Sequence, residues 1–140
     1  MNDLESARLL VDGTQRIVDA AVARAAEVTE GGAKIDDYQV HTERVTYLAT
    51  QVRAGHELTA AAERLAAAGK ADTLMAAEAF VYAAEAAHAT LAAVDAAWEE
   101  FGIGAALDAI GSAHLDTLRN AMRAGLAESR VREIDRKSVV

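Results

Sequence analysis

One pair of residues in this sequence has the types and spacing of metal ligands. Glu85 and His88 form an E-x-x-H motif, which places both side chains on one face of a helix. Di-metal helical bundles use two such motifs on different helices, together with two further inward-facing glutamates. The other three histidines lack a glutamate three residues before them. The sequence therefore predicts no metal site. Glu85 and His88 serve only the alternative of a metal-binding bundle, and a partly buried, paired histidine is the other interpretation of His88.

The sequence gives less support to nucleophilic catalysis and to nucleotide binding. Ser112 and His114 are close in sequence, but no third residue is identified that would orient them, and no oxyanion motif accompanies them. Closely spaced glycines occur in the segment 102–111. They follow an expected helix and not a strand, which differs from a dinucleotide-binding fingerprint. We interpret this segment as a turn between helices.

Composition excludes several classes of protein. The 140 residues include no cysteine, which excludes disulfides, thiolate metal sites and a cysteine nucleophile. The net charge of −8 disfavours binding to nucleic acid or to an anionic membrane surface. No apolar run reaches the roughly 18 residues of a membrane span, and the N-terminus lacks the basic region of a signal peptide. We therefore expect a cytoplasmic protein that binds neither nucleic acid nor membranes.

The elements that would position these residues are all expected to be helices. The sequence has no proline, where average usage of roughly 5% predicts about seven, and it is rich in alanine. Apolar residues recur every three or four positions, as in the second block, where Tyr38, His41 and Val45 begin a stripe. Glycines separate four blocks, at about 2–29, 37–68, 73–101 and 106–135. These features predict a single all-α domain over 1–140, folded as a four-helix up-down-up-down bundle.

The second block has the features of a well-capped helix start. In the segment 33–39, Asp36 can act as the N-cap, and Gln39 can complete a capping box. Ile35 and Val40 occupy the positions of a hydrophobic staple. Asp72 is the expected N-cap of the third block.

The order of these motifs resembles the C-terminal helical domain of flavin-dependent acyl-CoA dehydrogenases over nearly the whole chain. The similar segments are Ile35-Asp36-Asp37-Tyr38-Gln39 at a helix start, Leu48-Ala49 with Ala54, Ala68-Gly69-Lys70, and Ala83-Ala84-Glu85-Ala86-Ala87 in the third block. The resemblance implies the fold of that domain. The chain also looks like the extra N-terminal region of enzymes similar to methylsuccinyl-CoA dehydrogenase, which resembles a degenerate second copy of the domain.

The resemblance also indicates which functional positions are kept. The family's third helix ends in a glycine-rich stretch that meets the flavin of a neighbouring subunit, and Gly102 and Gly104 remain there. With Gln39, they are the implied cofactor-binding residues, and FAD is the implied cofactor of a complete enzyme or complex. Ala124 stands near the position of the family's glutamate base. Because alanine cannot accept a proton, the resemblance implies no catalytic residue in this chain.

We therefore expect a non-catalytic domain that is kept for packing and assembly. Its expected partner is either a flavoenzyme core acting on acyl-CoA thioesters or another copy of this chain. Two alternatives stay open. The bundle could itself bind FAD or acyl-CoA as a dimer, or it could bind a metal through Glu85 and His88.

Overall fold

The computed structural model describes residues 1–139, and over that range its only regular elements are helices, with no strand. The prediction of an all-α protein is confirmed, and Val140, the last residue of the predicted domain, lies outside the described residues. The elements are α1 (Asp3–Val28), the 3-10 helix η1 (Ile35–Tyr38), α2 (Gln39–Ala67), α3 (Thr73–Phe101), α4 (Gly104–Ile110), α5 (Ser112–Gly125) and α6 (Glu128–Ser138).

The three long helices match the first three predicted blocks closely. Asn2 and Glu5 form a capping box at the start of α1. Asp72 caps α3 as predicted, since its Oδ1 accepts a hydrogen bond of 3.0 Å from the Met75 N–H. The end of α3 also fits the sequence, because Gly102 adopts the left-handed conformation with φ of 60°.

The prediction of one continuous helix over 106–135 is wrong. Gly111, with φ of 85° and ψ of 146°, separates α4 from α5. Ala127, with ψ of 131°, separates α5 from α6. Both residues have extended ψ values that no α-helix accommodates. The last part of the chain therefore forms three short helices in place of a fourth rod.

The predicted cap of the second helix is also wrong. Residues Ile35–Tyr38 form a 3-10 turn, and α2 begins only at Gln39. Within residues 1–139, no side chain makes a capping hydrogen bond at the start of η1 or at the start of α2. The Gln39 amide instead donates to Asp36 Oδ1 at 3.3 Å. Ile35 and Val40, the predicted staple, are 49% and 64% exposed.

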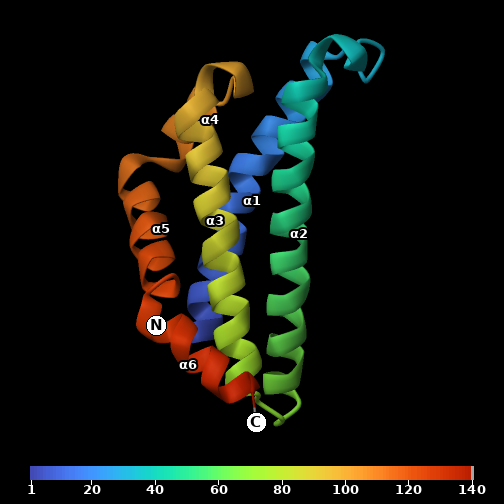
Figure 1. The fold of residues 1–140 in the computed structure, drawn as a ribbon. Helices are drawn as coiled ribbons and strands as arrows, with labels where there is room; N and C mark the ends of the chain where they lie inside the picture. The colour runs from blue at the N-terminus through green and yellow to red at the C-terminus, as the bar shows by residue number, and fades with distance from the viewer. Residues whose placement is uncertain (140) are drawn as a thin grey trace.

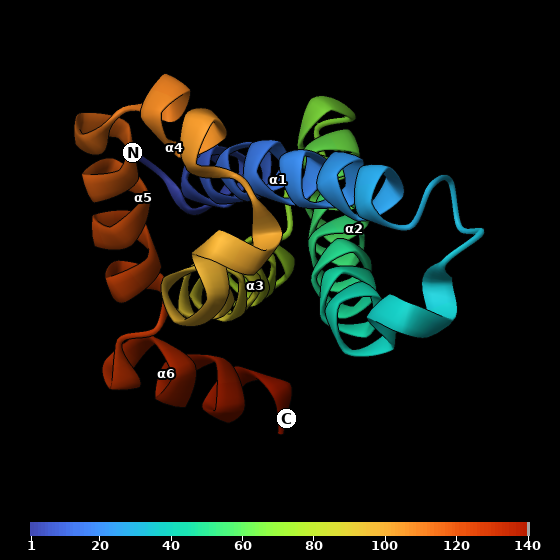
Figure 2. The same cartoon turned by 90° about the horizontal axis from the view of Figure 1, so that it is seen from above.

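The helices are arranged around a central pair, α1 and α3. Figure 1 shows α1 running upward, α2 downward and α3 upward again, and the view from above in Figure 2 places α2 on one side of the pair and α5 on the other. Small residues allow the close approach of α5. A Cβ on Gly125 would lie 2.5 Å from the Ala84 Cβ, and one on Gly13 would lie 2.4 Å from Leu118 Cδ2.

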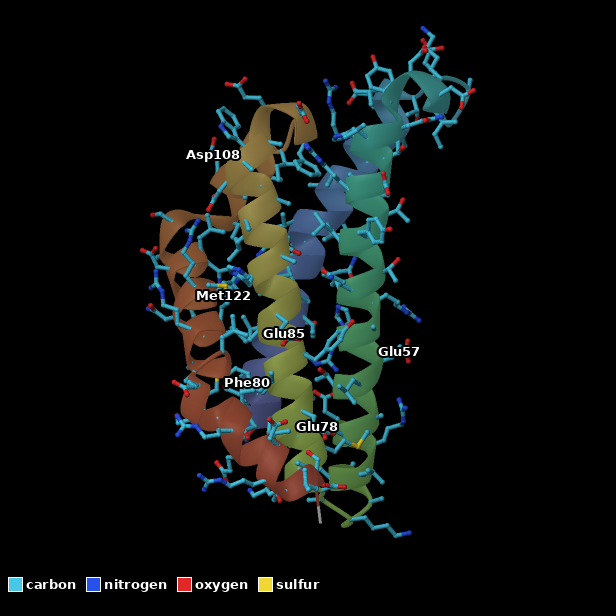
Figure 3. The ribbon with its side chains drawn as sticks, in the orientation of Figure 1. Glu57, Glu78, Phe80, Glu85, Asp108 and Met122 are labelled. Atoms are coloured by element: carbon cyan, nitrogen blue, oxygen red, sulfur yellow. The ribbon has the colours of Figure 1, made fainter. Side chains whose placement is uncertain are left out.

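The core follows this layout in two clusters. One is formed mainly by residues of α1, α2 and α3 and includes Ile17, Val52 and Phe101. The other lies between α1, α3 and α5 and includes Leu10 and Phe80. Figure 3 shows Phe80 and Met122 in the space between α3 and α5. No helix within residues 1–139 combines the length and the apolar character that crossing a bilayer requires.

The last helix, α6, closes the lower end of the structure. The Arg130 guanidinium lies 4.7 Å from the centre of the Phe80 ring. Its Nη1 also donates to Asp3 Oδ1 at 2.9 Å. One side chain thus joins α6 to both α1 and α3, through a cation–π contact and a charge-assisted hydrogen bond.

Candidate functional site

The predicted cofactor-binding residues all lie at helix ends in the upper part of Figure 1. Gln39 begins α2, Gly102 follows α3 and Gly104 begins α4. They do not share a cavity: the cleft at this end, as far as residues 1–139 define it, includes Gln39 but neither glycine. A Cβ on Gly102 would lie 2.7 Å from Arg24 Nε, and one on Gly104 would lie 3.6 Å from the Trp98 ring.

This cleft has a volume of about 660 Å³ and separates the end of α1 from the start of α2 and the end of α3. We call it the His41 cleft. Its lining mixes charged, polar and apolar side chains: Arg24, Val28, Asp36, Asp37, Tyr38, Gln39, Val40, His41, Arg44, Glu99 and Glu100.

His41 is the buried polar residue of this cleft. Its side chain lies on α2, and the residue is only 8% exposed. The imidazole packs against the Phe101 ring, with 5.1 Å between the ring centres. Among the described residues, neither ring nitrogen has a hydrogen-bond partner. Burial is the main cause that lowers the pKa of His41; the charge of Glu100 opposes it, and Arg24 and Arg44 reinforce it.

Two arginines border His41 and have weak partners. Arg24 Nη1 lies 3.0 Å from Glu27 Oε2, and Arg44 Nη1 lies 3.3 Å from Glu100 Oε2. Both pairs are well exposed, so each ion pair contributes little stability. The Nε of Arg24 is buried and has no partner in the part of the chain that the structure describes. The absence of a side chain on Gly102 makes room for this guanidinium.

The rest of the cleft carries negative charge. Four carboxylates line it, from Asp36, Asp37, Glu99 and Glu100, against the two guanidiniums. With His41 neutral, the lining has a net charge of −2 from these residues. Such a lining opposes ligands that carry several negative charges.

Sequence reasoning missed His41 as a site residue. It occupies an apolar-stripe position of the second block, and the stripe explains its burial correctly. The signal that could have found it is the polar residue at a core position, since a buried imidazole normally has a hydrogen-bond partner. The lack of a partner depends on the neighbouring helices, which the sequence pattern does not describe.

A second surface feature is an apolar groove between α1 and α2. We call it the α1–α2 groove. It has a volume of about 740 Å³ and is lined by Val22, Ala25, Ala26, Thr29, Ile35, Thr42, Val45, Thr46, Ala49, Thr50, Arg53 and Ala54. Large hydrophobic residues stand exposed in it and beside it: Val22 at 44%, Ile35 at 49% and Tyr47 at 64%.

The threonines of the groove present methyl groups to their surroundings. The hydroxyl of Thr46 donates to the Thr42 carbonyl at 2.7 Å, and that of Thr50 donates to the Thr46 carbonyl at 2.9 Å. The Thr42 hydroxyl donates to the Tyr38 carbonyl at 3.0 Å. Because these hydroxyls are satisfied within α2, the threonine row can be covered by an apolar partner without leaving donors unpaired.

A contrasting polar cluster lies at the other end of α1 and α2. We call it the Arg8 cluster, and it consists of Arg8, Asp12, His56 and Glu63. Arg8 donates to Glu63 through two nitrogens, with 3.0 Å from Nε to Oε1. Its Nη1 lies 3.2 Å from His56 Nδ1. The hydrogen bonds from Arg8 lower the pKa of Glu63.

The structure gives the metal candidates no support. Glu85 and His88 are both exposed on α3, so the prediction of a partly buried, paired His88 is wrong. Over residues 1–139, no three histidine or acidic side chains gather where they could hold a metal ion. Ala124 is exposed near the end of α5 and brings no titratable group to any site.

Comparisons with protein-family models, with curated proteins and with solved structures find no match for this chain.

Proposed function

We propose that this chain is a non-catalytic assembly domain, and that it pairs with a second copy of itself through the α1–α2 groove. The observation that carries the proposal is the exposed apolar lining of that groove. Contiguous exposed apolar surface of this kind marks interaction sites in soluble proteins. Small residues along the groove, Ala26, Ala49 and Ala54, allow a partner helix to approach closely.

The pattern of charges along α2 favours a second copy as the occupant. Glu43 and Arg53 are each five residues from Leu48, on opposite sides of it. If two α2 helices pack antiparallel with the two-fold axis level with Leu48, whose own side chain is buried in the core, Glu43 of each copy faces Arg53 of the other. The same register places Thr46 opposite Thr50. A face that complements itself in this way is what an isologous dimer needs.

The existing contacts do not oppose such a dimer. Arg53 now pairs with Glu57 one turn away on α2, at 2.7 Å between Nη2 and Oε1. Both side chains are more than half exposed, so exchanging this pair for an intermolecular one costs little. Tyr47 and Val22 would lose their exposure to water, and burial of such side chains stabilises by about 25 cal/mol per Å² of apolar area.

The resemblance to acyl-CoA dehydrogenase domains supports the same function. The resemblance rests on the order of the motifs along the chain. Ala124, near the position of the family's catalytic carboxylate, departs from the family and supports a domain without catalysis. We infer that the four-block, up-down-up-down plan of that domain is kept in α1, α2 and α3, with the fourth block divided into α4, α5 and α6. The alternative of FAD or acyl-CoA binding is less well supported, because the acidic lining of the His41 cleft opposes their phosphates.

Light scattering after size exclusion tests the proposal, with a matched pair of variants. We expect the protein to have twice its 14.7-kDa chain mass. T50E adds a charge to the groove, whereas T117E adds one to α5, and both remove a hydroxyl that bonds the carbonyl four residues earlier. T50E should give monomers and T117E should leave the dimer intact. A wild-type monomer at the highest soluble concentration contradicts the proposal.

Charge exchange tests the register of the dimer. E43R places two arginines opposite each other across the interface, which should weaken the dimer. E43R combined with R53E restores opposite charges and should restore it. If T50E disrupts the dimer while E43R alone and E43R combined with R53E have the same effect on it, the two-fold axis lies elsewhere than at the level of Leu48. A stable complex with a flavoenzyme core in place of the dimer rejects the second copy as the occupant.

A further inference from the structure

We propose that the His41 cleft binds a small zwitterion, in which a carboxylate and an ammonium group are joined by a short aliphatic chain. Three observations meet in this cleft. A nine-tenths-buried imidazole lines it without a hydrogen-bond partner among residues 1–139. Two guanidiniums border the imidazole with only exposed partners. Four carboxylates also line the cleft, and one of them, Glu100, is the partner of Arg44.

The carboxylate end of the ligand is assigned to Arg24 and Arg44. Each guanidinium offers several donors in a planar fork that suits a carboxylate. Their present partners, Glu27 and Glu100, are on exposed side chains that can turn to water at little cost. A ligand oxygen that reaches the imidazole would also give the His41 N–H an acceptor. Leaving a buried N–H unpaired is unfavourable, so this bond would favour the bound state.

The ammonium end is assigned to the acidic wall. Asp36 and Asp37 come from the turn η1, and Glu99 and Glu100 come from the end of α3. A ligand with a negative charge alone is drawn to the arginines but repelled by this wall, and a cation alone meets the reverse. Only a molecule with both charges matches the whole lining. The apolar side chains of Val28 and Val40 also line the cleft and suit a methylene chain.

The same lining argues against two other ligands. A phosphate or pyrophosphate would place two or more negative charges near four carboxylates. A metal ion would need converging ligands, and in the described part of the chain no set of three acidic or histidine side chains provides them. The cleft therefore fits a ligand with one positive and one negative charge better than a ligand with several charges of one sign.

Isothermal titration with three matched probes tests the proposal on the full chain. The probes are 6-aminohexanoate, which has both charges, hexanoate, which lacks the ammonium, and hexylamine, which lacks the carboxylate. We expect 6-aminohexanoate to bind about tenfold more tightly than either of the others, as one charge-assisted contact contributes. The C–H signals of the His41 ring should shift in NMR spectra on binding. Inorganic phosphate serves as the fourth probe and should bind more weakly.

Three variants locate the ligand. R44Q should weaken 6-aminohexanoate and hexanoate about equally, because it removes a carboxylate contact. D37N should weaken 6-aminohexanoate but leave hexanoate unchanged or improved. R64Q removes an exposed arginine near the end of α2, away from the cleft, and should change neither. Urea denaturation of each variant confirms that it is folded.

Several results overturn the proposal. The proposal is wrong if 6-aminohexanoate, at the highest soluble concentration, gives neither heat of binding nor a shift of the His41 signals. It is also wrong if the three organic probes bind with equal affinity, or if phosphate binds more tightly than 6-aminohexanoate. If R64Q weakens the binding of 6-aminohexanoate as much as R44Q does, the loss reflects a nonspecific effect of charge and not a contact in the cleft. None of these outcomes bears on the dimer, because the cleft and the α1–α2 groove are tested by different variants.

Discussion

The Arg8 cluster and the His41 cleft contain the same residue types, but their polar side chains differ in whether they have hydrogen-bond partners. Each combines a histidine of α2 with an arginine of α1 and nearby carboxylates. In the Arg8 cluster, Arg8 binds both oxygens of Glu63 and also approaches His56. In the His41 cleft, the imidazole is buried, and among residues 1–139 it has no partner at either nitrogen.

This difference separates a structural polar cluster from a candidate binding site. His56 keeps 23% of its side chain exposed, so water can reach it in addition to Arg8. His41 has neither route, and its unpaired nitrogens cost free energy that the fold must supply elsewhere. An arrangement that costs stability in the free protein is most easily explained at a place where a ligand restores the missing bonds.

Removal of the aromatic ring beneath His41 should have the largest effect. Phe101 is fully buried and contacts the imidazole, so F101A should lower the free energy of unfolding by about 3–5 kcal/mol. It should also admit water to His41 and move the pKa of that histidine back toward 6.5. Urea denaturation and an NMR titration of the histidine signals measure the two effects.

W98A provides the control for this variant. Trp98 lies one turn earlier on α3 but is 50% exposed, so its loss should change stability much less than F101A does. If F101A lowers stability but leaves the pKa of His41 unchanged, then burial against Phe101 is not what lowers that pKa.

The helices were easier to predict from the sequence than the site was. The end of α3 at Gly102 and its start at Asp72 depend on local capping, which sequence reports directly. The break at Ala127 has no glycine or proline at that position, and Gly111 reads equally well as a tolerated helical residue. His41 illustrates the limit for the site: the period of the helix predicts its burial, but only the packing of three helices determines its partners.

The two arginine–glutamate pairs should differ in their contribution to stability. E63A leaves Arg8 without its two-point partner, and the expected loss is about 1 kcal/mol after allowance for partial exposure. E100A removes the exposed partner of Arg44, and the expected loss is below about 0.5 kcal/mol. Urea denaturation at pH 7 compares them. Equal losses would mean that the Arg8 cluster is no more structural than the border of the His41 cleft.

Replacement of each of the two histidines by leucine should change stability differently. H41L removes two unpaired nitrogens and keeps an apolar contact with Phe101, so stability should rise by about 1 kcal/mol at pH 7. H56L removes a neighbour of Arg8 and should give no such gain. The same H41L variant should lose affinity for 6-aminohexanoate, which separates a binding role from a packing role.

The pH dependence of stability gives the last test of the comparison. Because the folded state lowers the pKa of His41 below the usual 6.5, the unfolded chain binds more protons between these two pKa values. The contribution of neutral His41 is therefore present above pH 6.5 and is lost as the pH falls through the folded pKa. H41L should flatten the stability curve in this window. A slope unchanged by H41L would mean that the imidazole finds a partner in solution, and the contrast with His56 would then disappear.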